Sequence, residues 1–232
     1  MRVELNVDLG ELPDEPKELY SIATTVNIAC GGHAGDTASM KRALTLAAES
    51  GAKVTAHPSY ADTQGFGRRP RFSEPARARD AILQQCTRLA AIADQLGIAV
   101  RSVKPHGALY HDASGDADYA AALIDGCQQA LELETIVGFP DTALEDIVKA
   151  RGIGFVREGF ADRRYDEDWQ LVPRSRPGAL LVEPEACVTQ AVSLARMGKV
   201  GTICIHGDTP HALTIGRAVR RALEQEGLLV GR

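Results

Sequence analysis

The chain has 232 residues, of which 44% are hydrophobic and 25% are charged, and its formal net charge is -5. This composition is typical of a globular protein, and the acidic balance argues against a nucleic-acid-binding surface, which needs a clustered basic face. No apolar stretch approaches the roughly 20 residues that a membrane span needs, so neither nucleic acid nor a membrane is expected as a partner. We expect one domain over residues 1–232, because α/β barrels of this length form single units.

Short β-branched runs alternate along the chain with longer amphipathic runs. The periodicity predicts strands over residues 3–9, 25–29, 53–56, 99–103, 135–138, 154–157 and 200–205. It predicts helices over residues 36–50, 73–96, 116–133, 141–150, 184–197 and 210–225. Strands that alternate with helices imply parallel pairing and right-handed crossovers.

About seven strand–helix units fit either a barrel or an open, doubly wound sheet. The chain has no G-x-G-x-x-G fingerprint after its first strand, where it reads DLGELP, and it has no Walker A phosphate loop. Many open sheets carry such nucleotide fingerprints. We therefore predict an α/β fold of the irregular (β/α)7 type, similar to a TIM barrel.

The five cysteines are scattered and form no C-x-x-C pair, which predicts free thiols in a reducing compartment. The first residues, MRVELNVDLGE, carry charges where a signal peptide would need an apolar core. We therefore expect a cytoplasmic protein. Cys30 and Cys204 are interpreted as buried, apolar thiols and not as nucleophiles.

Polar side chains gather where the predicted strands end. At least four of the six histidines lie within a residue or two of such an end. The carboxyl ends of barrel strands converge on one face, where active sites are built. One histidine at a strand end is often structural, but a whole set of them indicates a site. The candidates are Asp8, Asn27, His33, Asp36, His57, Lys104, His106, Glu158, Asp162, His206 and Asp208.

Two glycine-rich motifs follow the second and third strands. In NIACGGHAGD the glycines allow the backbone to pass close to a ligand, while Asp36 is also a suitable helix N-cap. In AHPSYADTQGFGRR, His57 ends a strand and begins a long loop, which is typical of functional segments. Arg68 or Arg69 of this loop is either an anion-binding residue or a solvated one.

Two motifs of the later chain add charged groups. In VKPHGALY, Lys104 and His106 are two apart on an extended segment and can face the same side. In ICIHGDTPHA the strand ends near His206, and Asp208 or the next residue caps the last helix. His211 is expected on the surface of that helix.

A divalent metal is a further hypothesis, although no compact signature such as H-E-x-x-H occurs. The suitable ligand types at the strand ends are Asp8, His33, His57 and His206.

Six motifs occur in order between Val3 and Pro210 and together resemble one family: LNVDLGE, NIACGGHAGD, AHPSYADTQGFGRR, VKPHGALY, FADRRY with LVPRSRPGA, and ICIHGDTP. They resemble the LamB/YcsF family, the A subunit of bacterial ATP-dependent 5-oxoprolinase. The resemblance implies an irregular barrel similar to that of the polysaccharide deacetylase and glycoside hydrolase superfamily. It also implies that 5-oxo-L-proline is opened to L-glutamate with ATP as co-substrate, in a complex with subunits B and C.

Two features depart from the family pattern. Gly32 stands where the family usually has an aromatic residue, and the loop after Glu11, which reads LPDEPKELYS, is shorter than usual. Both are expected to reshape the mouth of the pocket.

Opening a lactam needs an activated water, a stabilised oxyanion and a protonated leaving nitrogen. We hypothesise that Asp8 or His57 activates water, and that His206 or Asp162 serves the leaving amine. Lys104 and His106 are expected to hold the substrate carboxylate or the oxyanion. The expected substrate-binding residues are Asn27, His33, Asp36, Arg68, Glu158 and Asp208.

The absence of a Walker A loop fits a nucleotide handled at a partner subunit, or at a site without a short signature. A divalent metal is then either Mg²⁺ that accompanies ATP or an ion of the site itself. Two other functions stay open. One is a metal-dependent deacetylase or amidase that acts on a small amide or sugar without ATP, and the other is a non-catalytic subunit that only binds a small acid.

Overall fold

Seven parallel strands form a closed barrel in the computed structural model, which describes residues 2–231. They are β1 (Glu4–Leu9), β2 (Thr25–Ala29), β3 (Lys53–His57), β4 (Ser102–Val103), β5 (Thr135–Gly138), β6 (Gly154–Phe160) and β7 (Thr202–His206). Their order around the barrel follows the chain, and β1 closes the ring by pairing with β7. The predicted irregular (β/α)7 barrel is therefore confirmed.

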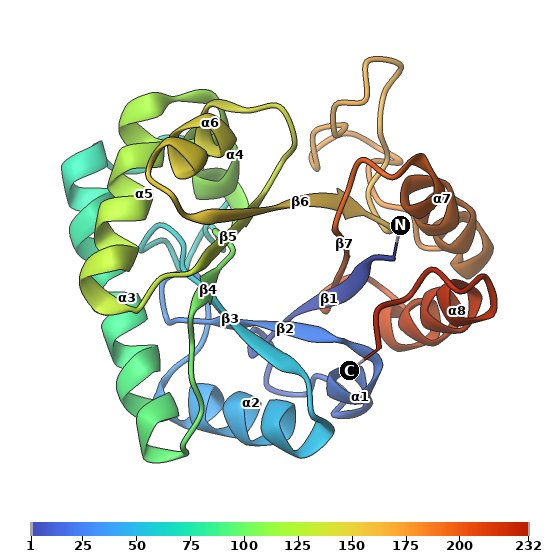
Figure 1. Cartoon of the computed structure of the whole chain (residues 1–232), viewed down its shortest axis with the longest axis horizontal. Coiled ribbons are helices and arrows are strands. Elements are labelled where there is room, and N and C mark those ends of the chain that lie inside the picture. Colours follow the sequence, from blue (N-terminus) through green and yellow to red (C-terminus); the bar gives the residue numbers. More distant parts are fainter. Residues whose placement is uncertain (1, 232) are drawn as a thin grey trace.

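Helices surround the strands (Figure 1). They are α1 (Glu18–Ile22), α2 (Thr37–Ser50), α3 (Pro75–Gln95), α4 (Gly107–Gly115), α5 (Ala117–Ala130), α6 (Ala143–Ala150), α7 (Pro184–Met197) and α8 (Ala212–Gln225). In α8, Ile215, Val219 and Leu223 recur every four residues and form the buried stripe. Among the described residues, no helix is both long and apolar enough to cross a membrane.

The interior of the barrel is polar, unlike the Val, Ile and Leu layers of most (β/α) barrels. In β1, Leu5 and Val7 belong to the apolar core between the strands and the helices. Asn6 alternates with them and points into the barrel, where it bonds to Glu158 and Thr202. The interior therefore contains a hydrogen-bonded network, beside a small apolar cluster of Tyr110, Phe160 and Cys204.

Strand register brings the polar residues to the same level. Asp8 of β1 is the register partner of Asn27 in β2 and of His206 in β7. His57 of β3 pairs with the last residue of β2. The candidate residues therefore meet at the carboxyl ends of the strands.

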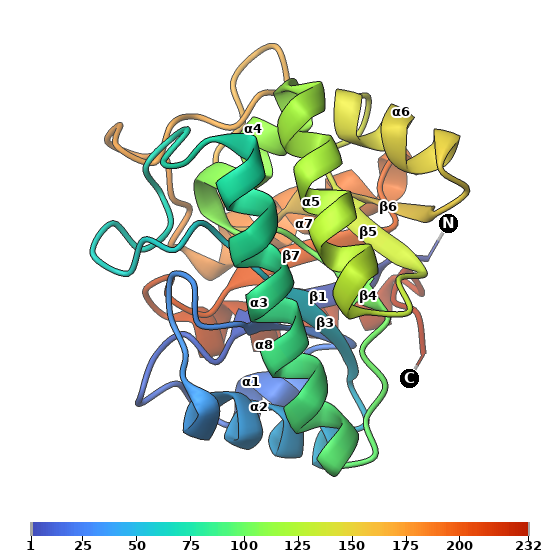
Figure 2. The ribbon, with the colours of Figure 1, turned by 90° about the vertical axis from the view of Figure 1, so that its left-hand side faces the viewer.

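The two long loops of the chain lie on one side of the barrel (Figure 2). They are residues 58–74, after β3, and residues 161–183, after β6. Both ends of the chain lie on the opposite side, where a parallel bridge joins Val3 to Leu229. The loops and the strand ends therefore share one face, where a (β/α) barrel builds its active site.

Four elements differ from the sequence-based expectation. Helix α1 is too short to show a periodicity, and α4 begins abruptly at Gly107, whose φ of 58° turns the chain out of the extended segment. Strand β4 has two residues instead of five, although the neighbouring backbone still bonds to the adjacent strands, as when Lys104 N–H donates to Ala56 O at 2.9 Å. Strand β6 continues to Phe160, so Glu158 lies within the strand and does not follow it.

All five cysteines are buried and free, as expected from their spacing. His211 is exposed at the N-cap position of α8, also as expected.

Asp36 forms a capping box at the start of α2. Its carboxylate accepts a hydrogen bond from Ser39 N–H at 2.8 Å, and Ser39 Oγ accepts one from Asp36 N–H at 2.8 Å. We predict that Asp36→Ala lowers the free energy of unfolding by about 1 kcal/mol, because one helix N–H loses its partner. Urea unfolding measures the effect. Asp36→Asn keeps the acceptor and serves as the control, and equal losses for both variants would contradict the capping role.

Candidate active site

The ammonium group of Lys104 lies at the centre of the polar interior. Lys104 is 2% exposed, and its Nζ is 2.8 Å from Asp8 Oδ1 and 3.0 Å from Glu158 Oε1. It also donates to Asn6 Oδ1 at 3.2 Å and to Cys204 Sγ at 3.0 Å. One buried cation therefore joins residues from β1, β6 and β7.

These contacts fix the charge states. Burial lowers the pKa of Lys104, but the charges of Asp8, Cys204 and Glu158 outweigh it and hold the pKa well above its ordinary value. Burial raises the pKa of Asp8, but Lys104 and His57 outweigh it and hold the pKa well below its ordinary range. Asp8 is therefore a carboxylate at neutral pH, deep inside the barrel.

The two oxygens of Asp8 have different surroundings. Oδ1 accepts hydrogen bonds from Lys104 Nζ and from Asn27 Nδ2, the latter at 2.7 Å. Oδ2 lies 3.4 Å from His57 Nε2 and 3.9 Å from His206 Nε2. One oxygen is thus anchored in the network, while the other faces two imidazoles and can take a proton.

Asp162 orients His206. Its Oδ1 is 3.0 Å from His206 Nδ1, and its Oδ2 accepts hydrogen bonds from His206 N–H at 2.9 Å and from the Thr209 hydroxyl at 2.6 Å. A carboxylate only accepts, so Nδ1 carries the proton and Nε2 points toward Asp8. The side chain of His206 is 12% exposed, so this imidazole lies between the buried network and the open face.

Beside Asp8 lies a second group, here termed the histidine–glutamate cluster: Glu11, His33, His57 and His106. Glu11 Oε1 is 2.9 Å from His33 Nε2, 3.3 Å from His106 Nδ1 and 3.7 Å from His57 Nε2. The rings of His33 and His106 are stacked, with centroids 3.6 Å apart. Glu11 is not among the residues expected from the sequence, although it follows the first strand closely in the motif LNVDLGE.

The imidazoles of His33 and His106 favour the neutral state. Burial and the neighbouring His106 lower the pKa of His33 to about 4, and burial lowers the pKa of His106 as well. Burial raises the pKa of Glu11, but the neighbouring imidazoles of His106 and His33 outweigh it and hold the pKa well below its ordinary value. At neutral pH the cluster therefore presents a carboxylate and imidazole lone pairs.

Two glycines let the loop after β3 lie directly on these rings. A Cβ at Gly67, whose φ is 65°, would lie 2.9 Å from His33 Cβ and 3.1 Å from His106 Cδ2. A Cβ at Gly107 would lie 2.5 Å from Gly67 O. Any larger residue would lift the loop away from the cluster.

Gly32 lies where the structure leaves no room for a side chain. A Cβ there would lie 2.3 Å from Gln85 Oε1 and 2.5 Å from Ser59 Oγ. Gln85 is buried and bonds to both backbone polar groups of Ser59. This side chain of α3 thus fills the space next to Gly32.

Arginines gather at the mouth of the site. Arg68 and Arg174 both pair with Asp208, the latter with Nη1 at 3.0 Å from Oδ2. Arg163 is buried, and its Nε is without a hydrogen-bond partner among the described residues. Burial is the main cause that lowers the pKa of Arg163, and the positive charges of Arg174 and Arg68 lower it further.

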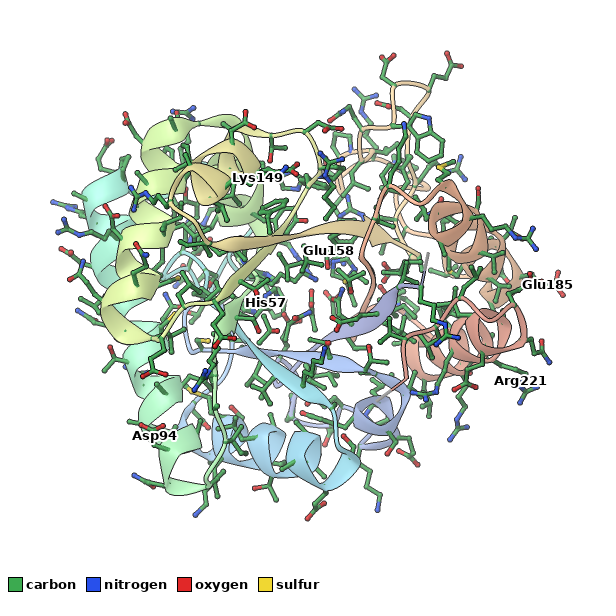
Figure 3. All side chains as sticks on the ribbon, viewed as in Figure 1. His57, Asp94, Lys149, Glu158, Glu185 and Arg221 are labelled. Carbon is green, nitrogen blue, oxygen red and sulfur yellow. The ribbon has the colours of Figure 1, made fainter. Side chains whose placement is uncertain are left out.

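Most of the expected residues meet in one place. Figure 3 shows His57 and Glu158 near the middle of the barrel, whereas Asp94, Lys149, Glu185 and Arg221 lie outside it. Asp36 is the exception, since it is exposed and caps α2 outside the site. Other residues of the site that were not expected from the sequence are Asn6, Tyr110 and Arg174. The alternation of polar and apolar residues in β1 could have indicated Asn6. Tyr110 and Arg174 have no such signal in the sequence.

The expected metal ligands separate into two groups. His33 and His57 join Glu11 and His106 in the histidine–glutamate cluster. The second group consists of Asp8, Cys204 and His206. The ligand types of both groups are ones that bind divalent transition metals.

A sequence profile of the LamB/YcsF family matches residues 3–231. The chain belongs to the LamB/YcsF family. It is 40% identical over 246 residues to the protein of Streptomyces avermitilis that is named as the A subunit of 5-oxoprolinase, covering 98% of each protein. It is 39% identical over 247 residues to the protein of the same name from Pyrococcus horikoshii, covering 99% of this chain and 97% of the relative.

Solved structures show the same fold. The crystal structure of a lactam utilization protein from Thermus thermophilus is similar with a TM-score of 0.89 and 34% identity, covering 99% of both chains. A family 4 carbohydrate esterase from Streptomyces lividans is similar with a TM-score of 0.58 and 15% identity, covering 100% of this chain and 92% of the other. A GH113 β-1,4-mannanase is similar with a TM-score of 0.56 and 11% identity, covering 97% of this chain and 99% of the other. The last two establish likeness of the barrel fold alone.

Lys104→Met removes the buried cation and leaves Asp8 and Glu158 without its compensating charge. We predict a loss of about 3–5 kcal/mol in the free energy of unfolding, measured with urea by circular dichroism. Lys149→Met is the matched control, because Lys149 is 58% exposed and its pair with Glu145 contributes at most about 1 kcal/mol. A loss as small as that of the control would contradict the central role of Lys104.

The ion pairs of Asp208 should make the free energy of unfolding depend on pH in the acidic range. Burial raises its pKa, but Arg174 and Arg68 outweigh this and hold the pKa at about 2, below the ordinary value of 3.8. The stabilisation, of about 2 kcal/mol, is therefore complete above about pH 4 and is lost as the pH falls toward 2. The difference in unfolding free energy between the native chain and Asp208→Asn should shrink between pH 6 and pH 3. A difference that is independent of pH would contradict this assignment.

Proposed function

We propose that the chain catalyses the ATP-dependent opening of the lactam of 5-oxo-L-proline to L-glutamate, as the A subunit of a cytoplasmic complex with subunits B and C. The observation that carries the proposal is the identity of about 40%, over nearly the whole length, to relatives named as the A subunit of 5-oxoprolinase. The lactam utilization protein of Thermus thermophilus supports the same class of substrate. The site offers the groups that hydrolysis of a lactam needs.

Asp8 is the group that we assign to water activation. Its Oδ2 faces the site between His57 and His206, whereas Oδ1 is anchored by Lys104. A carboxylate with one oxygen anchored and the other facing two imidazoles is oriented for proton abstraction from a water molecule. Of the two candidates from the sequence, Asp8 therefore suits this role better than His57.

His206 is assigned to the leaving amine. Asp162 fixes the tautomer of His206 and would stabilise the imidazolium form, as the carboxylate of a catalytic triad does. With Nε2 directed into the site, His206 can relay the proton from Asp8 to the ring nitrogen as the C–N bond breaks. The contacts of the Asp162 carboxylate are with His206 and Thr209, so Asp162 acts by positioning His206.

The arginines at the mouth are assigned to the substrate carboxylate. Arg68 and Arg174 come from the two long loops, and the buried Arg163 adds a third positive charge. A guanidinium binds a carboxylate with two parallel hydrogen bonds. Lys104 was expected in this role, but it is already engaged by Asp8 and Glu158 in the interior. We assign it to keeping Asp8 ionised.

ATP would act by phosphorylating the carbonyl oxygen of the lactam, which makes the carbon easier for water to attack. Breaking of the C–N bond would then leave an acyl phosphate, which a second water hydrolyses to L-glutamate and inorganic phosphate. The chain has no Walker A loop, so we propose that the nucleotide is bound with the help of the partner subunits. The polar face with the two long loops is the surface from which a phosphorylated lactam would reach Asp8.

The experiment that tests this proposal measures glutamate release from 5-oxo-L-proline by the chain alone and with subunits B and C, each with and without ATP. Release that requires both ATP and the partners supports the proposal. Hydrolysis of small amides by the chain alone without ATP would instead establish a stand-alone amidase. Ligand binding without any chemistry would establish a binding subunit.

His206→Asn removes the proposed acid while retaining a small polar side chain. We predict a fall in kcat of about 10²–10⁴-fold with an unchanged melting temperature, because general acid–base catalysis contributes on that scale. His211→Asn is the matched control, since His211 is exposed and its φ of 64° is one that asparagine tolerates. Equal activities of the two variants would remove His206 from the mechanism.

A further inference from the structure

The contacts around the histidine–glutamate cluster determine which ring nitrogen of each histidine carries the proton. His57 Nδ1 is 2.7 Å from Lys104 O. A carbonyl oxygen only accepts, so Nδ1 carries the proton and Nε2 has a free lone pair. Nε2 is the atom that faces the cluster.

His106 is oriented in the same manner but with the opposite nitrogen. Its Nε2 is 3.0 Å from Phe66 O, so the proton is on Nε2 and the lone pair is on Nδ1. Phe66 has a φ of 51°, a strained conformation for a non-glycine residue that commonly occurs at functional sites. His106 Nδ1 lies 3.0 Å from His57 Nε2, so two lone pairs face each other.

The protonated nitrogen of His33 is determined by its contact with the hydroxyl of Ser59. Its Nδ1 is 3.0 Å from Ser59 Oγ, and that hydroxyl donates its own hydrogen to Tyr60 O at 2.8 Å. Ser59 Oγ must therefore accept from His33, which leaves a lone pair on Nε2. This nitrogen lies 2.9 Å from Glu11 Oε1, again an acceptor opposite an acceptor.

Four acceptors thus converge in a buried place with no hydrogen-bond donor between them among the described residues. Each imidazole gives its N–H to a partner behind it, which is the arrangement that orients histidine ligands in metal sites. Four distances between acceptor atoms of the cluster are 2.9, 3.0, 3.3 and 3.7 Å. Ligands at about 2.0–2.1 Å from a tetrahedral Zn²⁺ lie about 3.3 Å from one another.

The second group does not have this property. Lys104 Nζ lies 2.8 Å from Asp8 Oδ1 and 3.0 Å from Cys204 Sγ. The ammonium already supplies a positive charge to two of the three members of that group. The structure therefore favours one cation position, in the histidine–glutamate cluster.

We propose that Glu11, His33, His57 and His106 bind one divalent transition-metal ion of the Zn²⁺ class. Three imidazoles and a carboxylate suit such an ion and not Mg²⁺, which prefers oxygen ligands. An ion there would act as a Lewis acid toward an oxygen of the substrate. This site goes beyond the proposed function, and its test needs no substrate and no partner subunit.

The test uses the whole chain after treatment with a chelator. Titration with Zn²⁺, followed by calorimetry, should give one equivalent per chain and raise the melting temperature. Titration with Co²⁺ should give the visible absorption band of a tetrahedral site. A chain that binds neither ion saturably would overturn the proposal and would mean that protons hold the cluster together.

Variants locate the ion. Glu11→Gln should weaken Zn²⁺ binding by more than about tenfold, and Ser59→Ala, which removes the acceptor behind His33, should weaken it about 10–100-fold. Glu18→Gln, in the same segment but exposed, is the matched control and should bind as the native chain does. Cys204→Ser tests the second group. Binding that survives both Glu11→Gln and Ser59→Ala but is lost in Cys204→Ser would overturn the assignment.

Discussion

The ion pairs of Lys104 are the interaction on which the rest of this structure depends. A barrel interior lined with Asn6, Asp8 and Glu158 would be unstable if their charges and amide groups were unpaired. The ammonium group compensates Asp8 and Glu158 together, while Asn6 bonds to both Lys104 and Glu158. Because Lys104 follows the short strand β4, this strand must lie deep enough for the side chain to reach β1 and β6. The position of β4 in the closed barrel and the charge balance of the interior therefore depend on each other.

Asp8 connects this interior to the chemistry at its edge. Its Oδ1 belongs to the Lys104 network, and its Oδ2 faces His57 of the histidine–glutamate cluster and His206 of the Asp162 pair. A change at any of the three groups therefore alters the electrostatic field at the same carboxylate. This sharing explains why so many titratable residues lie at the strand ends, where a scaffold would need few of them.

The sequence predicted the barrel and most of its polar residues because both have a regular period. His57 and His206 end apolar runs, so their place on the face of the barrel follows from the strands. Glu11 could not be assigned in the same way, since it lies in a loop whose path is set by Glu15, which accepts hydrogen bonds from Gly10 N–H. Asp36 is the converse case, because its motif predicted a site residue but its carboxylate caps a helix. Contacts between distant loops have no period that a sequence can display.

Asp208 pairs with two of the three arginines at the mouth, Arg68 and Arg174, one from each long loop. An acid that binds these two arginines displaces a carboxylate that is already bound to them. Binding is then an exchange of one ion pair for another, and the number of charges neutralised changes little. The affinity for a small acid should therefore depend only weakly on ionic strength, unlike that of an open basic patch. The exchange also releases Asp208 from Arg68 and Arg174. Binding of the ligand therefore also removes the ion pairs through which Asp208 links the two loops.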